Sequence, residues 1–92
     1  MEDSEYNTPT ERRLAEIWAE VLRLEKVKRD QDFFEIGGDS LLATTVVLKA
    51  CTAWEVKFTV RVLLDAPVLA DLAERIDRMV ADTGRQPARA GA

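Results

Sequence analysis

Ser40 is the residue whose type and position best suit chemistry in this sequence. It follows a Gly-Gly-Asp run at residues 37–39 and opens an apolar stretch with helical spacing. The unpaired amides and partial positive charge at a helix N-terminus are a natural site for a phosphate group. The two glycines let the backbone turn sharply and leave space for another molecule to approach the serine. The pattern therefore indicates an exposed hydroxyl at which a phosphodiester would be tolerated.

The chain supplies no base that would activate this hydroxyl. It contains no histidine, which excludes Ser-His-Asp and Cys-His catalysis and any histidine-containing metal site. Its single cysteine, Cys51, excludes an internal disulfide and a cluster of thiolates. We therefore expect no catalytic residue and no metal site, and another protein must activate Ser40 if it reacts.

A structural role explains the same residues without any chemistry. Asp39 is a good N-cap, because its carboxylate can accept the hydrogens of backbone amides one turn further along. Asp-Ser after Gly-Gly is also an ordinary way to begin a helix. From local physics alone, capping and attachment both remain open at Ser40.

The composition describes a small folded domain that is acidic overall. Of 92 residues, 47% are hydrophobic and 33% are charged, which suits one globular domain better than a disordered chain. Lys and Arg number 13 and Asp and Glu 17, so the net charge is −4, which argues against nucleic-acid binding. No apolar run approaches the ~20 residues of a membrane span, and the acidic N-terminus does not resemble a secretory signal. We expect a monomeric, cytoplasmic domain that is bound or acted on.

Hydrophobic spacing predicts three main helices and one short helix around a single core. The first helix runs from residue 9 to about 24, with Thr8 as N-cap, Pro9 at the first position and Glu11 completing a capping box. A long loop covers residues 25–38. At least two of its apolar residues should pin it to the core, and the candidates are Phe33, Phe34 and Ile36.

The second helix begins after the Gly-Gly pair and presents two faces. Its inward stripe consists of Leu42, Ala43, Val46, Val47 and Ala50. A mildly apolar outward face consists of Leu41, Thr44, Thr45 and Leu48.

The remaining elements are shorter. Residues 54–58 read as an extended stretch that turns Trp54, Val56 and Phe58 inward. Thr59 can cap the short third helix, which ends before Pro67 because proline disfavours helix at the preceding residue.

The last helix is predicted over about residues 68–82, with Gly84 as a C-terminal stop. These elements divide the chain into an N-terminal tail (1–7), one domain (8–83) and a disordered C-terminal tail or linker (84–92).

Two stretches of this sequence resemble a known family. The run Asp-Phe-Phe-Glu-Ile-Gly-Gly-Asp-Ser-Leu-Leu-Ala at residues 32–43 resembles the phosphopantetheine attachment motif of peptidyl carrier domains from nonribosomal peptide synthetases. Residues 60–73 are similar to that family's third helix and the start of its fourth, and residues 8–22 to its first. The resemblance covers nearly the whole domain. It implies an all-α, four-helix acyl-carrier-like bundle with a long loop between helices 1 and 2.

The resemblance also implies roles for the residues at the motif. A phosphopantetheinyl transferase would attach 4′-phosphopantetheine from coenzyme A to Ser40, with Gly38 and Asp39 beside it. The arm's thiol would hold an aminoacyl, aryl or peptidyl group as a thioester. An adenylation domain would load that group, and condensation, cyclisation or tailoring domains would use it. The chain itself would be a non-catalytic carrier.

Tethering replaces diffusion by a high effective concentration, so a carrier's own contacts with its partners can be weak and exchangeable. A small exposed patch suits such contacts. We therefore expect partners to dock on the outward face of the second helix, which consists of Leu41, Thr44, Thr45 and Leu48.

Three positions depart from the family's usual pattern. Asp39 stands where histidine is common, and Thr45 where many relatives carry arginine. Val68 stands where threonine or serine often caps the last helix, so we expect that helix to fray at its start.

Two alternative functions remain open from the sequence. One is an acyl carrier of polyketide or fatty acid synthesis, although those carriers usually have an acidic second helix and this one carries Lys49. The other is a helical interaction domain without a prosthetic group.

Overall fold

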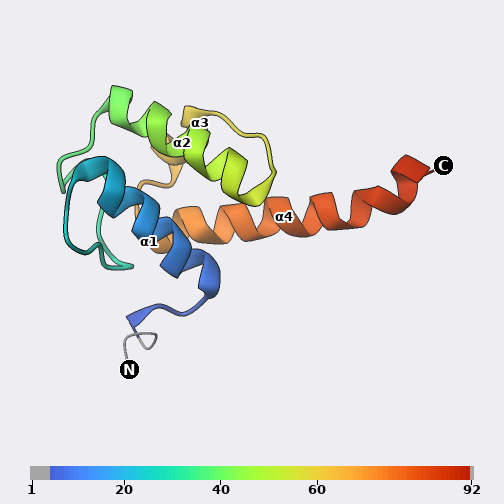
Figure 1. Ribbon diagram of the computed structural model, residues 1–92, viewed down its shortest axis with the longest axis horizontal. Coiled ribbons are helices and arrows are strands. Elements are labelled where there is room, and N and C mark those ends of the chain that lie inside the picture. Colours follow the sequence, from blue (N-terminus) through green and yellow to red (C-terminus); the bar gives the residue numbers. More distant parts are fainter. Residues whose placement is uncertain (1–4, 92) are drawn as a thin grey trace.

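The computed structural model describes residues 5–91, and it describes side chains as far as residue 82. This part of the chain forms four helices, α1 (Pro9–Leu22), α2 (Ser40–Trp54), α3 (Val60–Asp65) and α4 (Leu69–Gly91). In Figure 1, α2 lies above α1 and α4, and the long loop between α1 and α2 closes the end of the bundle away from the C-terminus. α1 packs against both α4 and α2, while α3 packs against α2. The predicted arrangement of three main helices and a short one is confirmed.

A single core lies where the helices meet. The predicted inward stripe of α2 is confirmed, because four of its five residues are buried and Leu42 is half-buried. The largest fully buried side chains come from every helix and from the loop: Trp18, Phe33, Leu14, Leu63, Leu69, Leu72, Ile76, Val27 and Val46. Burial of this apolar surface is the main term that stabilises so small a domain.

Helix α1 begins as predicted and ends earlier. Thr8 has an extended backbone, and its side chain accepts the amide hydrogen of Glu11 at 3.1 Å. The Glu11 carboxylate accepts from the amide of Asn7 at 2.7 Å, one residue before the position expected for a capping box. The helix ends at Leu22 because Arg23 adopts a left-handed conformation with φ 61°.

The segment that follows α2 differs from the prediction at its first residue. Trp54 is the last residue of α2, and the left-handed Glu55, with φ 54°, ends that helix. The extended stretch therefore begins only at Val56, which is buried. Thr59 then caps α3 as predicted, accepting from the amide of Arg61 at 3.3 Å.

Helix α4 is longer than predicted. It continues past the expected stop at Gly84 as far as Gly91, so this boundary was wrong. Helix propensity does not explain this extension, because Gly84 costs about 1 kcal/mol and Pro87 about 3 kcal/mol relative to alanine inside a helix. Figure 1 shows this end of α4 extending beyond the other helices. The division of the chain into a tail at 1–7, a domain at 8–83 and a tail or linker at 84–92 stays a prediction.

The residues just before α1 contact the rest of the described domain. Tyr6 is half-buried against the core, and its hydroxyl donates to the carbonyl of Val27 at 2.6 Å. Lys26 forms an ion pair with Glu5. The chain just before α1 therefore packs on the α1–α2 loop.

Loop carbonyls hold the first turn of α4. The amide of Leu69 donates to the carbonyl of Gln31 at 3.1 Å, and that of Ala70 to the carbonyl of Arg29 at 2.9 Å. Backbone carbonyls of the α1–α2 loop thus accept amide hydrogens that a side-chain cap would otherwise accept. The fraying expected at Val68 stays a prediction.

Candidate functional site

Ser40 is the first residue of α2 and is exposed to solvent. The preceding residue, Asp39, has an extended backbone, and its Oδ1 atom accepts the amide hydrogen of Leu42 at 2.8 Å. The Asp39 carbonyl accepts from the amide of Ala43 at 2.8 Å, the first bond of the helix. The predicted N-cap is confirmed, and it places the Ser40 hydroxyl at the positive end of the helix dipole.

The two glycines before the cap are required for different reasons. Gly37 has φ +112°, a conformation that residues with a side chain rarely adopt, and the space around it is open. At Gly38 a Cβ atom would lie 2.3 Å from the ring of Phe33 and 2.7 Å from the Phe33 carbonyl oxygen. Gly38 is therefore needed because the backbone runs directly against a buried aromatic ring.

Phe33 is the anchor that brings this segment to the core. Its side chain is fully buried, and its ring meets that of Trp18 edge-on, with centroids 5.0 Å apart. The Phe33 carbonyl accepts from the amide of Gly38 at 2.9 Å. Ile36 also packs against the core, so the prediction that at least two loop residues pin the segment is confirmed. Phe34 remains more exposed and packs its ring edge-on against that of Phe33.

Asp32 shapes the turn between this anchor and the glycines. Its Oδ1 atom accepts from the amides of Phe34 at 2.8 Å and Glu35 at 3.3 Å, and its carbonyl accepts from Ile36 at 3.2 Å. Side-chain acceptance two and three residues ahead is the usual Asx turn. The segment from Asp32 to Ser40 is thus held by its own hydrogen bonds as well as by Phe33.

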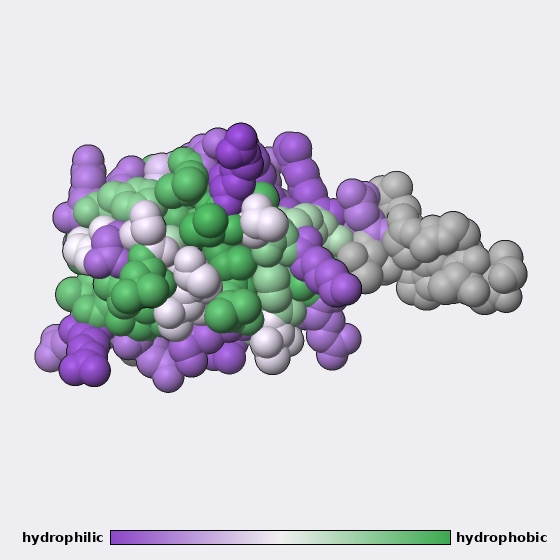
Figure 2. Space-filling model, turned by 90° about the horizontal axis from the view of Figure 1, so that it is seen from above, coloured by the Kyte–Doolittle hydropathy of each residue, from purple (hydrophilic) through white to green (hydrophobic). Residues whose placement is uncertain are grey.

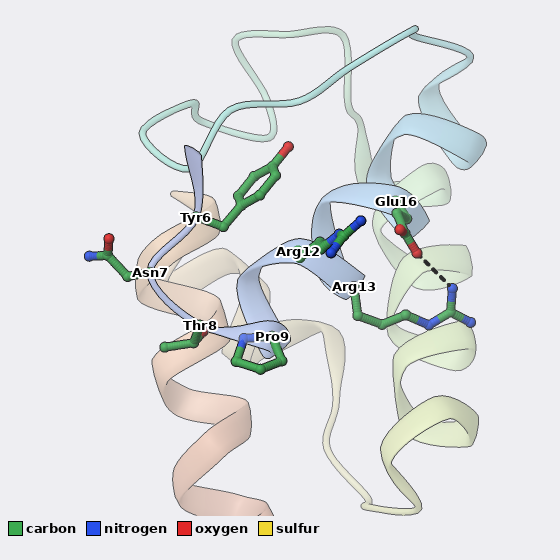
Figure 3. A pocket seen from close by; sticks show the side chains of 7 residues that line it. All are labelled: Tyr6, Asn7, Thr8, Pro9, Arg12, Arg13 and Glu16. Atoms are coloured by element: carbon green, nitrogen blue, oxygen red, sulfur yellow. Dashed lines mark hydrogen bonds and ion pairs between the residues drawn. The ribbon is translucent and has the colours of Figure 1, made fainter. Parts of the chain in front are cut away.

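The main hollows of the described residues lie away from Ser40. Figure 3 shows one of about 450 Å³ at the start of α1, lined by Tyr6, Asn7, Thr8, Pro9, Arg12, Arg13 and Glu16. In this hollow Arg13 and Glu16 form an exposed ion pair at 3.2 Å. Ser40 lines neither this hollow nor the others described, so its hydroxyl is offered at the surface rather than inside a cleft.

The face of α2 beside Ser40 is apolar. Leu41 is 77% exposed and Leu48 64% exposed, while Thr44 is exposed and Thr45 half-buried. Figure 2 shows apolar side chains gathered on this side of the molecule, over α2 and α3. Leu64 of α3, which is 49% exposed, was not predicted as part of such a surface. A helix of six residues has too few turns for its sequence to reveal which side faces solvent.

The threonines on α2 add little polarity to this surface. Three hydroxyls donate to carbonyls four residues earlier: Thr44 to Ser40 (3.1 Å), Thr45 to Leu41 (3.4 Å) and Thr52 to Leu48 (3.1 Å). A hydroxyl used in this way is less available to a partner. The methyl groups of these side chains therefore contribute to an apolar surface next to Ser40.

Two further properties concern the described residues as a whole. None of the described helices is long and apolar enough to cross a bilayer. Among residues 5–82, whose side chains the structure describes, there is no cluster of three or more acidic or cysteine side chains placed to hold a metal ion.

Comparisons with known proteins agree on one family. The family model named phosphopantetheine attachment site matches residues 12–76. Phosphinothricin tripeptide synthetase PhsB of Streptomyces viridochromogenes is 50% identical over 66 residues, which make up 72% of this chain and 6% of that synthetase. A solved nonribosomal PCP domain is 43% identical, with a TM-score of 0.70, over 76% of this chain and 90% of its own.

A second solved relative comes from a complex. A chain in the structure of the phosphopantetheine transferase Sfp with coenzyme A and a peptidyl carrier protein is 30% identical, with a TM-score of 0.76. The match covers 79% of the present chain and 95% of the other. The likeness extends over nearly all of these solved chains but over only a small part of the synthetase.

Proposed function

The chain belongs to the phosphopantetheine attachment site family and is a non-catalytic peptidyl carrier domain of nonribosomal peptide synthetases, and on this premise we propose that Ser40 is its attachment residue. The observation that carries the proposal is an exposed serine hydroxyl at the first position of α2, behind a segment anchored by Phe33. The two alternatives, a polyketide or fatty acid carrier and a domain without a prosthetic group, are not retained.

The residues around Ser40 fit a phosphopantetheine group. The first turn of α2 contains no acidic residue, and amides at a helix start favour a phosphate. Gly38 keeps the backbone close to Phe33, and Asp39 caps the helix that begins with the exposed Ser40. When bound, the group supplies a thiol on a flexible arm, which holds an aminoacyl, aryl or peptidyl group as a thioester.

Attachment uses one atom of this chain. The Ser40 oxygen forms a bond to the phosphorus that bears the pantetheine, and adenosine 3′,5′-bisphosphate leaves. The hydroxyl proton passes to a base of the transferase, because the chain has no histidine and Ser40 is a weak nucleophile on its own. This domain contributes the position of the Ser40 hydroxyl and its exposure to the transferase.

The apolar face next to Ser40 is the docking surface in this proposal. Leu41 and Leu48 are its most exposed leucines, with Thr44 and Thr45 between them. The partners are a phosphopantetheinyl transferase, an adenylation domain, and condensation, cyclisation or tailoring domains. Two solved relatives support the first two partners, a carrier in complex with the transferase Sfp and a McyG adenylation–PCP structure with phenylalanyl-adenylate.

Mass spectrometry tests the attachment site. The chain is incubated with coenzyme A, Mg²⁺ and a purified phosphopantetheinyl transferase of broad specificity, and it should gain the mass of one phosphopantetheine. Ser40→Ala should fold normally and gain nothing. Thr52→Ala, which removes another hydroxyl from an exposed position of α2, should be modified like the original chain. Modification of the Ser40→Ala variant would show that the site has been assigned wrongly.

A further inference from the structure

The carboxylate of Glu11 makes an ion pair that neither helix capping nor attachment at Ser40 requires. Glu11 is only 4% exposed, and Arg29 of the α1–α2 loop binds it through two hydrogen bonds. Arg29 Nε donates to Oε1 and Nη2 donates to Oε2, both at 2.9 Å. A bidentate pair of this kind fixes direction as well as distance, so the loop is tied to α1 in one orientation.

The same loop residue also holds the start of α4. The Arg29 carbonyl accepts from Ala70, and the Gln31 carbonyl accepts from Leu69. Two residues further on, the amide of Phe33 donates to the carbonyl of Pro67 at 2.8 Å. Residues 29–33 therefore form a short strap whose side chain contacts α1 and whose backbone contacts the α3–α4 junction.

The strap ends at the residue that positions the attachment segment. Phe33 receives the Gly38 amide on its carbonyl, and its ring occupies the space where a side chain on Gly38 would lie. Asp39 and Ser40 follow directly. A displacement of Phe33 would therefore be passed toward the start of α2 through its contact and hydrogen bond with Gly38.

We propose that Arg29 is a positioning residue for Ser40, acting through its bidentate pair with Glu11 and the strap at residues 29–33. The inference rests on the proposed attachment at Ser40. Loss of Arg29 leaves the Glu11 carboxylate buried without its main partner, which strongly favours movement of the strap away from α1. Ser40 then samples more orientations, and the transferase meets its productive orientation less often.

Three variants separate positioning from general stability. Arg29→Gln removes the charge and the fork of donors, whereas Arg29→Lys keeps the charge and loses the fork. Arg13→Gln is the matched control, because it removes an arginine from an exposed ion pair with Glu16 on α1. Each variant is compared with the original chain at a temperature at which circular dichroism shows all of them to be folded.

Transferase kinetics and amide exchange are the two readouts. Arg29→Gln should raise the KM of the transferase for this domain by roughly fivefold, within the range expected for coupling through a contact network. Arg29→Lys should be intermediate, and Arg13→Gln unchanged. Hydrogen exchange at the amides of Phe33, Gly38 and Leu42 should quicken in Arg29→Gln, while exchange at Val47 and Ala50 in the middle of α2 should not.

Results that would overturn the positioning proposal differ from the result that would refute attachment at Ser40. A KM for Arg29→Gln equal to that of Arg13→Gln, or exchange that quickens equally throughout α2, would show that the pair serves only global stability and would overturn the proposal. Should Arg29→Gln fail to fold, Arg29→Lys alone decides, through the same two readouts. Failure of the original chain to be modified at Ser40 would refute the proposed function instead, and exchange at Gly38 would still test the positioning.

Discussion

At the scale of single residues, the site depends on side chains that are small or absent. Gly37 adopts a backbone conformation closed to most residues, and Gly38 lies against the ring of Phe33. The carboxylate of Asp39 accepts the amide hydrogen of Leu42, so the cap of α2 does not require the hydroxyl of Ser40. Modification of that hydroxyl therefore costs the fold little stability.

Substitution of Asp39 should measure the cap. Asp39→Ala should lower the free energy of unfolding by about 1 kcal/mol, because the Leu42 amide loses its partner. Asp39→Asn, which keeps an acceptor, should lose much less. The measurement is the midpoint of denaturant unfolding at neutral pH. Equal midpoints for Asp39→Ala and the original chain would mean that the cap contributes nothing.

The two glycines should respond to alanine in different ways. Gly38→Ala should destabilise by about 1–3 kcal/mol, since its Cβ must displace the ring of Phe33. Gly37→Ala should cost about 1–2 kcal/mol from backbone strain alone. Because Phe33 packs on Trp18, only Gly38→Ala should shift the indole resonance of Trp18 in an NMR spectrum. An unshifted resonance in that variant would contradict the contact.

At the scale of elements, the α1–α2 loop behaves as a structural member of the bundle. It contributes Val27 and Phe33 to the core, and it supplies the carbonyls of Arg29 and Gln31 to the first turn of α4. The strength of the ion pair between Arg29 of this loop and Glu11 also depends on pH. The hydrogen bonds from Arg29 hold the pKa of Glu11 below its usual value, against the opposing effect of burial.

Acid should weaken this connection. A carboxylate whose pKa is lowered by folding contributes stability above its unfolded pKa of about 4.3, and that stability is lost as the pH falls through the lower folded value. The unfolding midpoint of the original chain should exceed that of Glu11→Gln at pH 7, and the difference should shrink below about pH 4. Glu16→Gln, which alters an exposed ion pair on the same helix, should have the same unfolding midpoint as the original chain at pH 7 and below about pH 4. A difference that stays constant down to low pH would argue against an ionised Glu11 as the stabilising partner.

At the scale of the whole molecule, the domain presents its reactive residue on the outside. The core is filled by apolar side chains, and the hollows described lie away from Ser40. Figure 2 shows that the surface over α2 and α3 is largely apolar. Such a surface suits short-lived contacts with several partners, because apolar contact adds affinity without requiring one polar geometry.

Polar substitutions on this surface should weaken the interaction with the transferase without changing the stability of the fold. Leu41→Ser combined with Leu48→Ser should reduce kcat/KM for modification by the transferase by roughly tenfold, from lost apolar contact at side chains 77% and 64% exposed. The unfolding midpoint should change little, because both side chains are largely in solvent. Leu24→Ser, at a 38% exposed leucine of the loop, is the control and should be modified at the original rate. An unchanged rate in the double variant would place the docking surface elsewhere.

The sequence by itself determined the local parts of this protein. Helical spacing, the caps at Thr8, Asp39 and Thr59, and the Gly-Gly-Asp-Ser run were readable because each depends on neighbours within one or two turns. The resemblance carried by the motif around Ser40 then named the family.

Only the tertiary structure decided the contacts between distant segments. The bond between Glu11 and Arg29, the capping of α4 by loop carbonyls and the exposure of Leu64 join or orient residues from separate elements. Backbone carbonyls are present at every residue, so no sequence pattern marks the two that cap α4. The necessity of Gly38 likewise became visible only when the ring of Phe33 was found beside it, because a missing side chain reveals nothing about its neighbour until the chain has packed.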